Sequence, residues 1–489
     1  MLKLTAASLT RSPVDILAVP VCEDADIHDN PELQELIAKA TGLEEFSGEK
    51  DQLVLLYDLP GAKAHRAVFL GVGPRRKLST ELLRLAAGRA VRKAMELKRE
   101  HLLIAAPLAS RVGLESRAIV KALLEGAYLA NHTFGLYKSK TDNKSLKYIS
   151  LMVTPRLVQE YKALAQHVET ICQATVQARE WVSTPANDKP PLQLAKAIVS
   201  SARKANLNAH IMEAPQLQKQ KFGALLAVAA GSTHPPCLVE LVKGPKTAEE
   251  TIVLVGKGVT FDTGGINIKP SSGLETMKAD MSGAAAVAGA MLAIAKGKTK
   301  RRVVGILPLV ENMPSGSATR PGDIVTSYSG KTVEIGNTDA EGRLILIDAM
   351  AYAIAKYKPS LLIDLATLTG ACVVALGERM AAVFSPDNHL AEAIIAAGLD
   401  THERCWRMPL PEDYKELLKS DLADINNMPS TRYGGAITAA LFLAEFVGDT
   451  RWAHIDIAGP AHQKKANGYC GPGGTGFGVR LLCELLEKI

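Results

Sequence analysis

Short apolar runs alternate with longer amphipathic segments through the first third of the chain. The aliphatic runs predict strands at residues 14–19, 52–57, 67–71 and 102–106. Segments in which apolar residues recur every three or four positions predict helices at residues 79–98 and 116–131. Such alternation is typical of an α/β sandwich built around a mainly parallel sheet.

The C-terminal part of the chain repeats this pattern. Aliphatic and β-branched runs predict strands at residues 251–255, 302–309 and 360–365, and alanine-rich segments predict helices at 283–296 and 344–357. We therefore expect two α/β domains, each with a mainly parallel or mixed sheet flanked by helices. In an open sheet of this kind, ligands bind in loops at the carboxyl ends of the strands.

Residues 155–181 have helical spacing and lead into the proline-rich turn from Ser183 to Pro191. This turn is the best candidate for a boundary. The predicted organisation is an N-terminal domain at 1–150, a connector at 151–190 and a catalytic domain at 191–489.

Length and composition narrow the class of protein. The 489 residues are 47% hydrophobic and 22% charged, which is typical of a globular chain with two or three domains. The seven cysteines are odd in number and never have C-x-x-C spacing, which disfavours disulfide frameworks and zinc ribbons and favours a reducing compartment. We find no signal-peptide pattern, and no apolar stretch reaches the roughly 18–20 uncharged residues that a membrane span needs. A cytoplasmic protein without a membrane partner is expected.

The net charge is +6, from 57 Lys and Arg against 51 Asp and Glu. Basic residues gather between Arg75 and Arg99 and again in Lys298–Arg302. A solvated surface is one interpretation of these clusters, and an additional DNA-binding regulatory role is the alternative.

Three glycine-rich loops contain the candidate chemistry. They span residues 256–270, 277–284 and 336–344, and the first follows a predicted strand directly. Gly256 and Gly258 lack the third glycine of a dinucleotide-binding fingerprint, and the chain contains no P-loop sequence. A nucleotide site is therefore disfavoured.

The same loops contain four carboxylates: Asp262, Asp280, Asp339 and Glu341. Each alone is typical of an Asx-turn, a helix cap or a surface pair. Gathered in one cleft, the four would repel one another unless two divalent cations neutralised them. Asp339, Glu341 and Arg343 are also spaced two residues apart, so an extended segment would present all three side chains on one face.

The octapeptide Asn337-Thr-Asp-Ala-Glu-Gly-Arg-Leu344 resembles the signature of the leucyl (cytosol) aminopeptidase family. The pattern V-G-K-G-x-x-F-D-T-G-G at Val255–Gly265 is similar to a metal-binding stretch of the same family. The resemblance covers roughly residues 180–489, and the N-terminal third resembles the smaller, macro-like α/β domain of the family in size and pattern.

This resemblance implies a two-metal centre with Mn²⁺ or Zn²⁺. Asp262 and Glu341 would bridge the ions, Asp339 would complete one site, and Lys257 with Asp280 would complete the other. Lys269 would stabilise a gem-diolate formed by a metal-activated water, and Arg343 would hold a bicarbonate that acts as general base.

The resemblance also implies a substrate and an assembly. Peptides with a free N-terminus would lose a first residue, with Leu, Met and other apolar residues preferred, and the chain would form a homohexamer. The residues implied to bind substrate are Met277, Asn337, Thr367, Leu368, Gly370, Ala458 and Ala461. His454 and Asp456, which alternate on a predicted strand, are expected to support the site or to lie in the core rather than to react.

Overall fold

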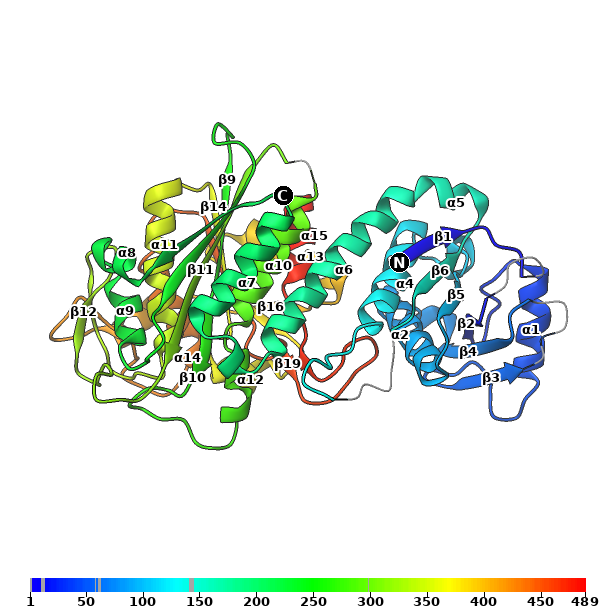
Figure 1. The fold of residues 1–489 in the computed structure, drawn as a ribbon, viewed down its shortest axis with the longest axis horizontal. Coiled ribbons are helices and arrows are strands. Elements are labelled where there is room, and N and C mark those ends of the chain that lie inside the picture. Colours follow the sequence, from blue (N-terminus) through cyan, green and yellow to red (C-terminus); the bar gives the residue numbers. More distant parts are fainter. Residues whose placement is uncertain (1, 10–13, 58, 60–62, 140–144, 298) are drawn as a thin grey trace. The chain divides into compact units, whose positions relative to one another are not determined.

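The computed structural model describes residues 2–9, 14–57, 59, 63–139, 145–297 and 299–489. The chain divides into two compact units. Unit 1 contains Met1–Gln173 and Lys465–Pro472, and unit 2 contains Ala174–Lys464 and Gly473–Ile489. Each unit is a mixed sheet flanked by helices, which confirms the predicted fold class (Figure 1).

Unit 1 has a six-stranded sheet in the order β1-β6-β5-β2-β4-β3, in which only the β3–β4 pair is antiparallel. The strands are β1 (Leu2–Thr5), β2 (Ile16–Cys22), β3 (Leu53–Tyr57), β4 (Arg66–Gly73), β5 (His101–Ala105) and β6 (Tyr148–Met152). The helices are α1 (Pro31–Thr41), the short 3₁₀ turn Arg75–Lys77, α2 (Thr80–Glu96), α3 (Ala109–Val112), α4 (Ser116–Ala130) and α5 (Pro155–Glu160). α6 (Lys162–Ser183) runs from unit 1 into unit 2.

Arginines of the basic segment 75–99 make contacts inside unit 1. Arg84 is buried, and its Nε lies 2.6 Å from Glu125 Oε2. Arg92 Nη2 donates to the carbonyl oxygen of Cys470 at 2.9 Å. These side chains hold α2 against its neighbours. Lys298, the first residue of the second basic cluster, lies outside the described residues.

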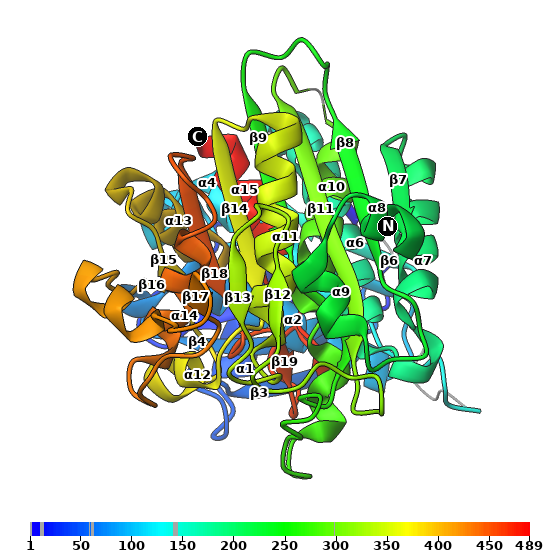
Figure 2. The same ribbon diagram turned by 90° about the vertical axis from the view of Figure 1, so that its left-hand side faces the viewer.

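Unit 2 is built on a nine-stranded sheet in the order β16-β15-β18-β14-β9-β11-β8-β7, with β10 paired to β11 (Figure 2). Its strands are β7 (Asn208–Glu213), β8 (Cys237–Lys243), β9 (Thr251–Gly256), β10 (Gly258–Asp262), β11 (Arg302–Asn312), β14 (Leu361–Ala366), β15 (Ala381–Phe384), β16 (Cys405–Arg407) and β18 (Trp452–Asp456). Smaller sheets are formed by β12 (Ile324–Thr326), β13 (Thr332–Glu334) and β17 (Ile425–Asn426), and by β19 (His462–Gln463) and β20 (Gly473–Gly474).

Helices cover both faces of this sheet. α9 and α11 lie on one face, and α7, α10 and α15 lie on the other (Figure 1). The helices are α7 (Pro191–Lys204), α8 (Ala214–Lys219), α9 (Gly223–Ala229), α10 (Ser282–Ala295), α11 (Glu341–Tyr357), α12 (Gly370–Leu376), α13 (Asn388–Thr401), α14 (Gly435–Ala444) and α15 (Val479–Lys488). Short 3₁₀ segments are η2 (Ala186–Asp188), η3 (Leu274–Ala279) and η4 (Glu412–Leu418). Because both faces are covered, β14 is buried along its whole length and β9 along nearly all of it, which explains their largely apolar sequences.

Parallel pairing fixes where the strands of unit 2 end. β9, β14 and β18 are parallel neighbours, so their carboxyl ends lie at one edge of the sheet. β10 runs parallel to β11 and ends at Asp262. The loops that follow these strands therefore open at the same edge.

One described stretch, Leu274–Ala295, is long and apolar enough to cross a membrane by length and composition. The prediction that no apolar stretch reaches roughly 18–20 uncharged residues still holds here, because Glu275, Lys278 and Asp280 lie within this stretch. Of its most apolar window, 78% is buried, and α10 packs against β9, β11 and α15. This is the environment of a core helix.

Asp348 shows how a buried carboxylate ties a helix and a loop to α11. It is fully buried on α11 and accepts hydrogen bonds from the backbone N–H groups of Leu225, at 2.9 Å, and Tyr328, at 2.7 Å. Burial raises the pKa of Asp348 to about 7. Its carboxyl group therefore links α9 and the loop after β12 to α11.

We expect Asp348→Ala to lower the free energy of unfolding by about 2–4 kcal/mol, because one buried and one partly buried N–H donor lose their acceptor. Urea unfolding followed by far-UV circular dichroism measures this change. Asp449→Ala, at an exposed position, is the control and should leave the unfolding midpoint in place. Equal midpoints for the two variants would contradict the role of Asp348.

Candidate metal centre

Side chains from three distant loops meet at the carboxyl edge of the unit 2 sheet. Lys257 follows β9, Asp262 ends β10, Asp280 lies between η3 and α10, and Glu341 begins α11. One carboxylate oxygen from each of Asp262, Asp280 and Glu341 lies within 4.8 Å of the other two, and all three residues are buried. The structure thus brings together acids that are up to 79 positions apart in the sequence.

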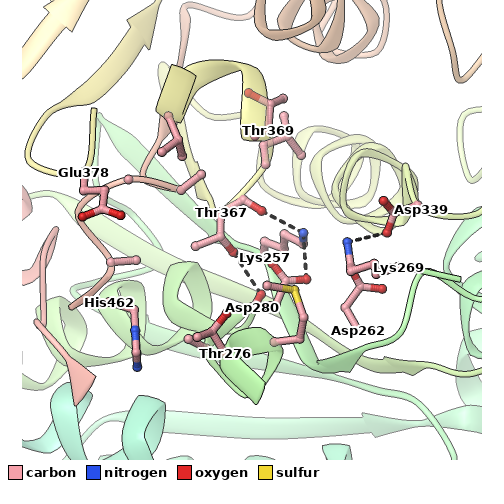
Figure 3. A pocket seen from close by; sticks show the side chains of 18 of the residues that line it. Lys257, Asp262, Lys269, Thr276, Asp280, Asp339, Thr367, Thr369, Glu378 and His462 are labelled. Atoms are coloured by element: carbon pink, nitrogen blue, oxygen red, sulfur yellow. Dashed lines mark hydrogen bonds and ion pairs between the residues drawn. The ribbon is translucent and has the colours of Figure 1, made fainter. Parts of the chain in front are cut away.

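Lys257 lies between two of these acids. Its Nζ is 2.9 Å from Asp280 Oδ2 and 2.8 Å from Glu341 Oε1, and it donates to the carbonyl oxygen of Thr367 at 2.8 Å (Figure 3). Burial by itself would lower the pKa of Lys257, but the two carboxylates outweigh burial and raise this pKa above its usual value. Thr367 Oγ1 also donates to Asp280 Oδ1 at 2.7 Å, which fixes the orientation of that carboxylate.

Lys269 occupies the equivalent place on the other side of the cluster. Its Nζ lies 2.8 Å from Asp262 Oδ2 and also pairs with Asp339 (Figure 3). Asp262 Oδ1 in turn accepts from Asn312 Nδ2 at 2.8 Å. The loop and the end of β11 thereby hold Asp262 in one orientation.

The charges of the cluster do not balance. Four carboxylates face two ammonium groups, which leaves two negative charges in a largely buried cleft. Burial raises the pKa of Asp280 well above its usual value, against the opposing effect of Lys257, and burial also raises the pKa of Asp262 and Asp339. Each ammonium group marks a position between two acids where a cation is stabilised. The donor set therefore fits two hard or borderline divalent ions.

The first turn of α11 differs from the sequence-based expectation. Glu341 and Arg343 are helical, not extended, so their two-residue spacing from Asp339 does not place the three side chains on one face. Gly342, between them, is needed for close packing. A Cβ there would lie 2.6 Å from Lys257 Cε, so a larger residue would displace the Lys257 side chain.

Arg343 is buried beside the cluster. Its Nη1 donates to the carbonyl oxygen of Asn427 at 2.6 Å, and its guanidinium lies over the Phe442 ring at 5.9 Å from the centroid. Burial lowers the pKa of Arg343 to about 10, so it stays charged at neutral pH. Among the described residues, its Nε has no hydrogen-bond partner.

A cavity of about 430 Å³ opens beside the acids and is lined by all four of them and by both lysines. Six of the seven residues implied to bind substrate line it, namely Met277, Thr367, Leu368, Gly370, Ala458 and Ala461. Neither Asn337 nor Arg343 belongs to this lining. Asn337 Oδ1 instead accepts from the backbone N–H of Asp339 at 2.7 Å, so it shapes the loop that carries this acid.

Several residues of the site were not found from the sequence. Asn427 is fully buried, and its amide bonds the backbone of Gly336 and Asn337, so it fixes the loop before α11. Asn312 has a similar role toward Asp262. The position of Asn312 shortly after a predicted buried strand could have indicated its role from the sequence, whereas no local sequence pattern indicates the role of Asn427. Thr276, Glu378, His462 and Lys464 also line the cavity.

Asp456, at the end of β18, organises the loop after β14. It accepts from the backbone N–H of Leu368 at 3.1 Å and from Thr369 Oγ1 at 2.7 Å. His454 Nδ1 lies 2.6 Å from Asp364 Oδ1, in the core of the sheet. Neither residue lines the cavity, as expected of supporting positions.

Both parts of the chain match models of one protein family. Residues 176–483 match the catalytic domain of the cytosol aminopeptidase family, and residues 19–141 match its N-terminal domain. A probable cytosol aminopeptidase of Chlorobium limicola is 42% identical over 100% of this chain and 99% of its own length. One from a Geobacter species is 44% identical over 91% of this chain and 90% of its own length.

Solved structures agree with the sequence matches. A variant of tomato leucine aminopeptidase superposes with a TM-score of 0.87 at 34% identity and covers 100% of this chain and 96% of its own. The bottromycin maturation enzyme BotP in complex with Mn has a TM-score of 0.86 at 35% identity, covering 97% of this chain and 99% of its own. The chain therefore belongs to the cytosol aminopeptidase family and is an aminopeptidase, a hydrolase that removes residues from the N-terminus of peptides.

Proposed function

We propose that this aminopeptidase uses two divalent ions, Mn²⁺ or Zn²⁺, to release Leu, Met and other apolar residues from peptides with a free N-terminus. One observation carries the proposal: Asp262, Asp280 and Glu341 converge within 4.8 Å beside a cavity wide enough for a side chain. The relative BotP was solved in complex with Mn, which supports the choice of Mn²⁺.

Five residues would hold the ions. Asp262 and Glu341 would bridge them, Asp339 would complete one site, and Lys257 with Asp280 would complete the other. Lys257 would bind as the neutral amine, so it must give up its proton when the centre is loaded. When bound, the ions would supply an activated water and a Lewis acid, and a bicarbonate at Arg343 would supply a base.

Lys269 and Arg343 would act without ligating the metals. Lys269 lies on the cavity wall with its ammonium among the acids, where it can meet negative charge that develops on the scissile carbonyl oxygen. Arg343 has a buried Nε donor with no described partner and keeps its positive charge, which suits an anion such as bicarbonate.

The apolar part of the cavity would take the first side chain. Met277, Ala458 and Ala461 offer an apolar wall, and Leu368 and Gly370 continue it on the loop after β14. Burial of an aliphatic side chain there contributes roughly 25 cal/mol per Å² of surface removed from water, which favours Leu and Met. The small side chain of Ala461 leaves room for a long one.

The proposal extends to location and assembly. All seven cysteines are buried and form no disulfide, which suits a reducing cytoplasm. Assembly as a homohexamer is supported by the family to which the chain belongs.

We expect an N-acetylated leucyl peptide to be cleaved at least about a hundredfold more slowly than its free-amine twin, because an amide nitrogen has no lone pair available for a cation. Initial rates of both peptides with the Mn²⁺-loaded enzyme measure the difference. Chelation followed by addition of Mn²⁺ is the control, since it should abolish and then restore cleavage of the free peptide. Equal rates for the two peptides would contradict the proposed role of the α-amine.

A further inference from the structure

The cavity beside the metal centre has a second polar end. Glu378, from the turn after α12, and His462, at the start of β19, lie on the side opposite Asp262, Lys269 and Asp339 (Figure 3). The lining of the cavity also has apolar side chains, which include Met277, Val373 and Ala461. The cavity therefore offers an entering side chain both apolar surface and, away from Asp262 and Asp339, a carboxylate.

The backbone at Glu378 is held in place by Gly459. A Cβ on Gly459 would lie 2.4 Å from the carbonyl oxygen of Gly377 and 3.3 Å from Glu378 Cα. Only glycine permits this contact, which packs the turn after α12 against the loop after β18. Since Ala458 and Gly459 both line the cavity, Glu378 is built into its wall.

The carboxylate of Glu378 has no ion pair or hydrogen bond to any residue that the structure describes. Its side chain is exposed, and among the described residues no arginine lines that cavity, although Lys464 does. An unpaired carboxylate at the end of an apolar wall attracts a cationic group that arrives on an aliphatic stem.

Two other titratable groups share this end of the cavity. His462 is half-buried, and burial, together with the nearby ammonium groups of Lys278, Lys464 and Lys189, lowers its pKa, so it is neutral at pH 7. Lys464 is exposed. Backbone hydrogen bonds lower the pKa of Glu275, which lies outside the cavity lining, and the ammonium group of Lys464 lowers this pKa further. Glu378 therefore supplies the negative charge at this end of the cavity, and the exposed Lys464 supplies a positive charge on the same lining.

We infer that Glu378 selects first residues with a cationic end, so that N-terminal arginine and lysine are cleaved alongside the apolar residues and acidic residues are rejected. The inference rests on the proposed function, because it places the first side chain in this cavity. The stem of arginine or lysine would lie against Met277, Val373 and Ala461, and its charged end would reach Glu378.

The test compares aminoacyl coumarin amides of Leu, Met, Arg, Lys and Glu with the Mn²⁺-loaded enzyme. Glu378→Gln keeps the shape of the side chain and removes its charge, so the ratio of kcat/KM for the Arg amide to that for the Met amide should fall about tenfold. Glu378→Lys should lower that ratio further and raise the Glu-to-Met ratio. Glu392→Gln, an exposed position on α13, is the matched control and should change neither ratio.

Three results would overturn the inference. The first is a wild-type enzyme that cleaves the Leu amide but not the Arg amide, and the second is an Arg-to-Met ratio unchanged in Glu378→Gln. The third is a Lys464→Gln variant whose selectivity shifts more than that of Glu378→Gln, since Lys464 would then set the preference. A wild-type enzyme that cleaves no amide in a metal-dependent way would instead contradict the proposed function itself.

Discussion

Glu341→Ala is expected to lower kcat/KM for leucine amide by about a thousandfold, equivalent to about 4 kcal/mol of transition-state stabilisation. Glu341 lies in the centre of the cluster, 2.8 Å from Lys257 Nζ and within 4.8 Å of the ligand atoms of Asp262 and Asp280. A ligand that bridges two ions serves both of them, so its loss should weaken the whole centre. The measurement is the number of metal ions per chain, determined together with the rate.

Asp339→Ala separates the two proposed sites. Asp339 would complete only one of them, so its loss should leave about one tightly bound ion per chain where the parent binds two. Asp449→Ala is the control and should keep both ions and the parental rate, since this exposed residue lies outside the cluster. A Glu341→Ala enzyme with two ions and parental activity would end the two-metal proposal.

Lys269→Met is expected to lower kcat for leucine amide by about 10²–10³, the usual loss when one donor to a developing oxyanion is removed. Methionine keeps the length and apolar stem of lysine but has no ammonium group to meet the charge. The second measurement is again metal content, because Lys269 also pairs with Asp262 and Asp339. Two ions per chain in a slow variant would assign the loss to the ammonium group.

Lys296→Met is the matched control, because it removes an ammonium group from an exposed position at the end of α10. It should leave kcat and metal content as in the parent. If Lys269→Met instead raised KM with kcat unchanged, Lys269 would contribute to substrate binding alone, and its proposed role toward the carbonyl oxygen would be wrong.

The local periodicity of apolar residues was sufficient to predict most of the helices and strands around the site. The strand predicted at 251–255 is β9, and the helix predicted at 283–296 is α10, each within one residue at both ends. Side-chain burial repeats every two residues in a strand and about every 3.6 in a helix, so a short segment carries its own signal. The same local reasoning failed for Glu341 and Arg343. Their two-residue spacing would place both side chains on one face of an extended segment, but α11 already begins at Glu341.

The sequence by itself determined the kind of fold, the family and the acids available for metal binding, because periodicity and an octapeptide are properties of adjacent residues. Only the tertiary structure decided that Asp262, Asp280 and Glu341 meet, since the parallel order of β18, β14, β9 and β11 brings their loops to one edge. It also decided that Glu378 faces the same cavity. Such contacts join positions far apart in the chain, and no pattern of neighbouring residues encodes the distance between them.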